Sequence, residues 1–227
     1  PSLLFLRRLR QLGWSDEATG ESLRLRRVQQ PSASEDAGQG GARDGVEEWS
    51  VTVEELECSH EGGPQPQAWA RRYLRCAAVL SVPPMHAASA SGPTTEIVLA
   101  LPLPEAERAA NAGGADGGRH SDGVCQVFCF LPVRDVGLRF ALHAQFSLVT
   151  NRDDVHASAW NRWLRDSAAR LFVAAVAAQP PDACVPALAF LPSGLRSPEP
   201  FWQLFVDGAV RELRDSPLAV LHSESGE

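Results

Sequence analysis

Residues 124–179 read VCQVFCFLPVRDVGLRFALHAQFSLVTNRDDVHASAWNRWLRDSAARLFVAAVAAQ. Residues 124–133 form an apolar run rich in aromatic and β-branched side chains, which predicts a buried strand. Asp135 and Gly137 then predict a loop. A second strand is expected over residues 138–149, because alternate positions put apolar side chains on one face: Phe140, Leu142, Ala144, Phe146 and Leu148.

The clearest helix signal in the chain follows a polar, turn-like segment at residues 150–156. Apolar residues recur there at steps of three and four and form one stripe: Trp160, Trp163, Leu164, Ala168, Leu171, Phe172, Ala175 and Val176. Ser158 is the expected N-cap, and Gln179 before Pro180 is expected to end the helix. The expected order is strand, loop, strand, polar turn and helix, which makes a folded core rather than a site.

Three segments of this region resemble a repeated pattern of the sacsin family. They read FCFLPV (128–133), HAQFSLVTNRDD (143–154) and WNRWLRDSAARLF (160–172). The resemblance is strongest over residues 128–172, and it extends more weakly to PSLLFLRRLRQL at the start and PFWQLFVDGAVRELRDSPL near the end.

In the sacsin family these segments follow an ATPase domain similar to that of the ninety-kilodalton heat-shock chaperones. The resemblance implies that this chain lies downstream of such a domain. The family's ATPase motifs, an acidic-x-x-x-Asn helix and an Asp-x-Gly-x-Gly loop, are then expected upstream, together with ATP and Mg²⁺, and both motifs are expected to be absent from this chain. We therefore expect this chain alone to bind no cofactor and to be no enzyme.

The composition fits a protein with a hydrophobic core. The chain has 227 residues, of which 44% are hydrophobic, and a formal net charge of -7. A general nucleic-acid or membrane-surface binder would need a basic face, and no apolar run has the length of a membrane span. We expect a cytoplasmic protein with neither kind of partner. Because the sequence begins at Pro1 and not at a methionine, we expect it to be a piece of a longer protein.

The five cysteines are odd in number and irregularly spaced, which favours buried free thiols over a disulfide framework. Cys125 and Cys129 would share a strand face about 13 Å apart, too far to bind one zinc ion. Cys58 and His60 could be half of a metal site, but no second pair matches them. No metal site is expected.

Outside the central region we expect further strands and a second long helix. The strands are a hairpin of residues 10–14 with 22–28, an edge-type strand within 47–58, a strand at 94–101 and a possible last strand at 218–221. The second helix begins at Pro200 and has Trp202, Phe205, Ala209 and Leu213 on one face.

Two further segments are less clear. Residues 69–80 have apolar spacing that fits a helix, whereas their place in the resembling family favours a strand. In residues 2–9 the apolar side chains are so crowded that their spacing does not distinguish a helix from a strand, and the resembling family has a short helix there.

The resulting fold class is α+β: a mostly antiparallel sheet with two long helices packed on it. We expect one domain over residues 1–227 with Gly- and Pro-rich interruptions. Residues 30–45 and 105–123 are expected to be flexible insertions, and residues 180–198 a Pro-rich connector to the last helix.

The turn at Asn151, Arg152, Asp153 and Asp154 is the main candidate site. In the chaperones to which the resemblance points, an arginine in a comparable turn contacts the nucleotide. By that analogy Arg152 would sense nucleotide in the longer protein, with Asn151 and Gln145 as polar supports. A guanidinium suits this role because it binds phosphate at two points and stays charged. The alternative is an Asx turn that caps the helix, with Arg152 paired to a carboxylate.

Three functions follow from these observations. The leading hypothesis is a non-catalytic segment of a sacsin-like chaperone that couples an upstream ATP-binding domain to a client protein or a neighbouring module. The second is a protein-interaction scaffold with no link to nucleotide. The third is a small hydrolase that uses His143 and Ser147, for which the sequence offers no identifiable orienting carboxylate.

Overall fold

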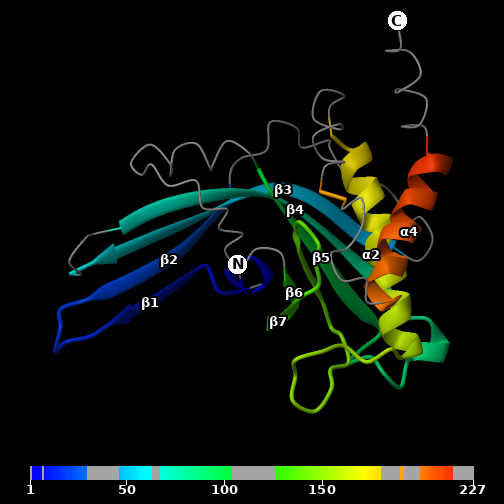
Figure 1. Ribbon diagram of the computed structural model, residues 1–227, viewed down its shortest axis with the longest axis horizontal. Coiled ribbons are helices and arrows are strands. Elements are labelled where there is room, and N and C mark those ends of the chain that lie inside the picture. The colour runs from blue at the N-terminus through cyan, green and yellow to red at the C-terminus, as the bar shows by residue number, and fades with distance from the viewer. Residues whose placement is uncertain are drawn as a thin grey trace, which may run out of the picture.

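The computed structural model describes residues 2–6, 8–29, 46–62, 67–103, 126–179, 190–191 and 200–216. These residues form an eight-stranded sheet in the order β1-β2-β3-β4-β5-β8-β6-β7. All neighbouring strands are antiparallel except β6 and β8. Two long helices pack on one face of the sheet, and β1, β2 and one end of β3 and β4 extend away from them (Figure 1). The expected α+β class is confirmed.

The elements have the following bounds in chain order. They are the 3-10 helix η1 (Ser2–Phe5), β1 (Gln11–Ser15), β2 (Ser22–Gln29), β3 (Val46–Glu61), β4 (Gln67–Ser81), the 3-10 helix η2 (Pro84–His86), β5 (Thr94–Pro102), β6 (Gln126–Cys129), β7 (Leu131–Asp135), β8 (Ala141–Ala144), α2 (Ala159–Ala177) and α4 (Pro200–Asp215).

Both predicted helices are present, and so is the predicted cap. The Ser158 hydroxyl accepts a hydrogen bond from the Asn161 amide at 3.1 Å, so it satisfies a donor that the first turn of α2 leaves free. In α4, Trp202, Phe205 and Ala209 are buried against α2 and the sheet, as their spacing predicts. The hairpin of β1 and β2 and the strand β5 are also confirmed.

The ambiguous segment at 69–80 is part of the strand β4. Its apolar residues mimic helical spacing because both faces of the strand are covered. Leu74, Cys76 and Leu80 face the long helices, whereas Tyr73 and Ala77 face η1. A strand that is buried on both sides shows no simple alternation, so the helical pattern was misleading.

Three strand predictions need correction. The segment within 47–58 is not an edge strand, because β3 pairs with β2 on one side and β4 on the other. The run at 124–133 is divided at Phe130 into β6 and β7. The strand expected at 138–149 is confined to β8, and the chain beyond it turns toward α2, leaving a single bridge between Leu148 and Val155.

The sheet has a separate hydrophobic core on each face. The larger one lies under α2 and α4, where Phe140 packs against Phe172 and Phe205 at centroid distances of 5.5 and 5.8 Å. The smaller one lies under η1, where Leu4 and Phe5 are almost completely buried. The 3-10 helix η1 therefore covers one face of the sheet, and α2 and α4 cover the other.

Several predictions lie outside the described residues. These are the insertions at 30–45 and 105–123, most of the connector at 180–198, and the possible strand at 218–221.

Candidate functional site

The polar turn predicted at 150–156 is a closed loop between β8 and α2. The Val149 amide donates to the Asp154 carbonyl at 3.1 Å, and the His156 amide donates to the Ser147 carbonyl at 3.0 Å. At the tip, the Arg152 amide donates to the Val149 carbonyl at 2.9 Å. Hydrogen bonds between its own backbone groups therefore close the loop, and Arg152 lies at its tip.

The first turn of α2 holds this loop in place through Asn161. This side chain is completely buried. Its Oδ1 accepts from the Ser147 amide at 2.8 Å, and its Nδ2 donates to the carbonyls of Ser147 and His156, both at 2.7 Å. Next to it, the Trp160 indole donates to the Gln145 carbonyl at 2.9 Å. Trp160 and Asn161, the Trp-Asn pair of the sacsin-like pattern, therefore form a clamp that holds the loop from both sides.

Arg152 has an unusual backbone conformation. Its φ is 61°, in the left-handed region that residues other than glycine and asparagine rarely adopt. The side chain is exposed, and no carboxylate among the described residues pairs with it. It lies close enough to Cys129 for its charge to act on that thiol. The turn is also tied to β7, because Arg134 and Asp154 form an ion pair at 3.0 Å.

The structure brings the three candidate residues together only in part. Asn151 and Arg152 share the tip of the loop, where the Asn151 amide donates to Asp153 at 2.6 Å. Gln145 is half-buried at the start of the loop, and no described hydrogen bond joins its side chain to Arg152. That bond joins two side chains, whereas an Asx turn needs a side-chain oxygen that accepts from the backbone amide two residues on, and α2 is capped by Ser158 and not by an aspartate.

His143 occupies a structural position within the smaller core. It is buried, its Nδ1 accepts a hydrogen bond from the Phe130 amide at 3.3 Å, and its ring stacks on Phe5 at 5.3 Å. Phe130 has a φ of 63°, so this bond helps to hold a strained turn between β6 and β7. His143 and Gln145 also line a pocket of about 450 Å³ beside η1.

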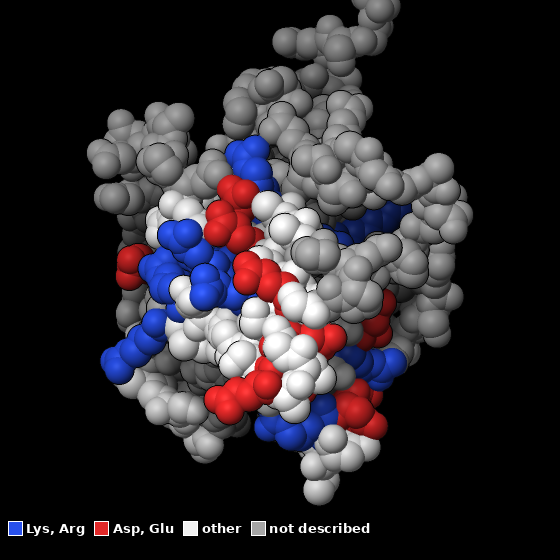
Figure 2. All heavy atoms as spheres, turned by 90° about the vertical axis from the view of Figure 1, so that its left-hand side faces the viewer, with Lys and Arg blue, Asp and Glu red and all other residues white. Residues whose placement is uncertain are grey.

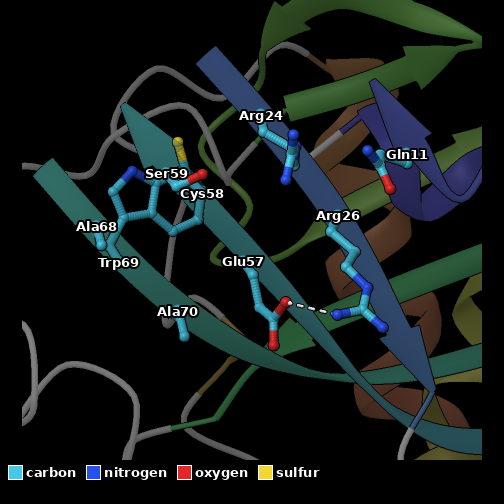
Figure 3. A pocket seen from close by; sticks show the side chains of 9 residues that line it. All are labelled: Gln11, Arg24, Arg26, Glu57, Cys58, Ser59, Ala68, Trp69 and Ala70. Carbon is cyan, nitrogen blue, oxygen red and sulfur yellow. Dashed lines mark ion pairs between the residues drawn. The ribbon is translucent and has the colours of Figure 1, made fainter. Parts of the chain in front are cut away.

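A second depression, of about 530 Å³, lies on the extended end of the sheet (Figure 3). Arg24 and Arg26 from β2 and Glu57 from β3 point into it. Arg26 and Glu57 approach within 3.7 Å, and both side chains are largely exposed. Such a pair contributes little energy, and the carboxylate offsets the positive charge that an anion would need. On this end of the molecule, basic and acidic side chains lie interspersed (Figure 2).

The buried ion pair of Arg27 and Glu54 was missed by the sequence reasoning. The guanidinium makes two 2.7 Å hydrogen bonds to the carboxylate, and both side chains are more than nine-tenths buried. Arg27 also donates to the carbonyls of Leu3 and Leu6, so it anchors η1 to the sheet. The available signal was local: the alternation of Leu23 and Leu25 in β2 places Arg27 on the same, inward face.

Cysteine and metal chemistry find no support in the part of the chain that is described. Burial raises the pKa of the Cys129 thiol, against the opposing effect of Arg152, and raises that of Cys76 to about 12. Cys58, Cys76 and Cys129 are free thiols. The described residues contain no group of three or more His, Cys, Asp or Glu side chains able to hold a metal ion. None of their helices is both long and apolar enough to cross a membrane.

Comparisons with known proteins give one short similarity. No family model matches the chain, and no solved structure matches it. The chain is similar to Protein NO VEIN of Arabidopsis thaliana, with 45% identity over 51 residues, which are 22% of this chain and 2% of that protein. The chain therefore spans only a small part of that relative's length, and the sacsin resemblance stays an expectation.

The expectation that both ATPase motifs are absent from this chain is wrong for the sequence itself, since two short strings match them. Residues 36–40 read DAGQG and residues 107–111 read ERAAN. Both lie outside the described residues, so the structure gives no geometry for them.

Proposed function

We propose that this chain is a non-catalytic segment of a sacsin-like chaperone, in which the turn at Arg152 contacts nucleotide bound in an upstream domain. Through α2 and the sheet, that contact would be coupled to a client protein or a neighbouring module. The observation that carries the proposal is the state of Arg152: it is exposed, unpaired among the described residues and held at a positive φ.

The energetics of the loop support this role. A left-handed conformation costs an ordinary residue about 1–2 kcal/mol. A glycine or asparagine at this position would avoid most of that cost, yet the chain has an arginine. Strained residues persist where the surroundings fix them, and Asn161 and Trp160 fix this loop from its base. A guanidinium presented in this way can make charge-assisted hydrogen bonds to a phosphate without reorganising the loop.

The test uses a longer protein that includes the upstream nucleotide-binding domain. Arg152→Ala should lower its ATP turnover about 10- to 100-fold, the equivalent of losing charged hydrogen bonds worth about 1.5–3 kcal/mol. Arg211→Ala is the matched control, because Arg211 is also exposed and lies on α4. Thermal unfolding of both variants should match that of the unsubstituted protein. Unchanged turnover in the folded Arg152 variant would refute the proposal.

The second candidate is an interaction scaffold with no nucleotide link. It is favoured by three exposed apolar side chains on and beside β1: Leu9, Leu12 and Trp14. Hydrogen exchange of the loop at 147–156 in the longer protein separates the two candidates. Protection that increases when ATP is added supports the nucleotide link, whereas identical exchange with and without ATP supports the scaffold.

A further inference from the structure

The strand β1 is an open edge with an apolar surface. It is the terminal strand of the sheet, all five of its residues are exposed, and among the described strands it pairs only with β2. Leu12 and Trp14 are 42% and 54% exposed and lie on the same face of the strand. Edge strands usually carry a charge, a proline or a bulge that prevents pairing with another chain. Within Gln11–Ser15, β1 has neither a charge nor a proline, and its pairing with β2 is regular.

The backbone of β1 has hydrogen-bonding groups available on its outer side. The Arg27 amide donates to the Arg10 carbonyl at 2.8 Å. In an antiparallel ladder such bonds involve alternate residues, so Leu12 and Trp14 also direct their backbone groups toward β2. The backbone groups of Gln11, Gly13 and Ser15 then point outward, where a further strand can pair with them.

The sequence of this edge is complementary to itself. Residues 10–16 read RQLGWSD, with a cation at one end, an anion at the other and Gly13 in the middle. When two copies run antiparallel about a twofold axis at Gly13, Arg10 faces the partner's Asp16, and Leu12 faces the partner's Trp14. Hydrogen bonds from Ala18 and Thr19 lower the pKa of Asp16, so this carboxylate is charged at neutral pH.

We propose that two copies of this chain associate through β1, antiparallel, with Gly13 on the twofold axis and the sheet continuous across the interface. This is an isologous contact that adds a strand to an open edge. Two neighbouring registers are worse. An axis at Leu12 places Arg10 against the partner's Trp14, and an axis at Trp14 places Asp16 against the partner's Leu12, so each leaves charges unpaired. This inference does not depend on the nucleotide link.

Disulfide cross-linking of Gly13→Cys tests the register directly. In the proposed pairing the two Cα atoms at position 13 are about 5.5 Å apart, within the range that a disulfide spans. Gly92→Cys is the matched control, because Gly92 lies in an exposed loop with no atom within 4 Å of an added Cβ. Both variants carry Ser at Cys125 and Cys184 to remove background thiols.

Mild oxidation should give a covalent dimer of Gly13→Cys and leave Gly92→Cys monomeric. Preferential cross-linking of Leu12→Cys or Trp14→Cys instead would show a different register and overturn the proposed one. Equal, slow cross-linking of the variants at positions 13 and 92 would show that β1 does not pair with a second copy.

Sedimentation of the chain without added cysteines tests the association itself. Gly13→Lys places two like charges on the axis, and a side chain there fits the fold because an added Cβ meets only the Leu23 carbonyl oxygen, at 4.0 Å. We expect a reversible dimer that Gly13→Lys weakens about tenfold or more and Gly92→Lys leaves unchanged. A chain that is monomeric at every concentration, or a dimer that Gly13→Lys does not weaken, would overturn the proposal.

Discussion

Replacing Asn161 by alanine tests whether the first turn of α2 fixes the Arg152 loop. The side chain is fully buried and makes three hydrogen bonds to the backbone of Ser147 and His156. Alanine removes all three: the Ser147 amide and the His156 carbonyl lose this partner, whereas the Ser147 carbonyl still accepts from the His156 amide. A hydrogen bond of this kind contributes a net ~1 kcal/mol, and a buried group left without one is destabilising by more.

The expected loss of unfolding free energy is therefore about 3 kcal/mol. Ser147 and His156 are themselves exposed, so water can bind the freed backbone groups, which limits the loss to about this figure. Asn151→Ala is the matched control: it removes one exposed hydrogen bond, to Asp153, and should lower stability by about 0.5 kcal/mol or less.

Urea denaturation of the isolated chain gives both values, provided that the m-value is the same in all variants. The loop itself is followed by hydrogen exchange of the Ser147 and His156 amides, which should lose protection in Asn161→Ala and keep it in Asn151→Ala. If the two variants differ by less than about 1 kcal/mol, the clamp does not hold the loop, and the support it lends to Arg152 is lost.

Three further predictions follow from buried groups. Arg27→Met should destabilise the chain by about 3–5 kcal/mol because it leaves Glu54 buried without its partner. The double variant with Glu54→Leu should recover most of this loss. Arg26→Met, which removes an exposed ion pair, is the control and should have little effect in the same urea titration. Burial raises the pKa of the Cys76 thiol from 9.0 to about 12, so the thiol ionises at a lower pH in the unfolded chain than in the folded one. The free energy of unfolding should therefore fall by up to about 1.4 kcal/mol per pH unit above pH 9. Cys76→Ala should remove this part of the pH dependence, as measured by unfolding curves at alkaline pH. Ser158→Ala should lower the unfolding free energy by about 1 kcal/mol, since the N-cap hydrogen bond to α2 is lost, and an unchanged urea midpoint would contradict this assignment.

The sequence predicted those elements that are buried on one side. In α4 the apolar residues at 202, 205 and 209 form the inward stripe, and in the loop between β8 and α2 the polar composition predicted a turn. These signals work because one-sided burial imprints its period on the sequence. Ser158 was identifiable for a similar reason, since a hydroxyl immediately before an apolar stripe is a local feature of a helix start.

Features that depend on two distant segments could not be predicted in this way. The inner position of β3 depends on which strands flank it, and no local pattern encodes the order of strands. Phe130 has a positive φ that sequence rules assign to glycine or asparagine; it is held there by His143, which is distant in sequence. Asn161 looks like an ordinary polar residue near a helix start, and only the return of the loop onto α2 makes it a clamp.

The two proposed surfaces lie at opposite edges of the sheet, which allows them to be tested independently. β1 is one terminal strand, and β7, to which the Arg152 loop is tied through Arg134 and Asp154, is the other. A dimer formed through β1 therefore leaves Arg152 accessible to nucleotide in a neighbouring domain. Accordingly, Gly13→Lys should change sedimentation and leave ATP turnover of the longer protein intact, whereas Arg152→Ala should do the reverse. If either variant changes both measurements, the two edges are coupled through the sheet, and association would then have to be treated as part of the nucleotide response.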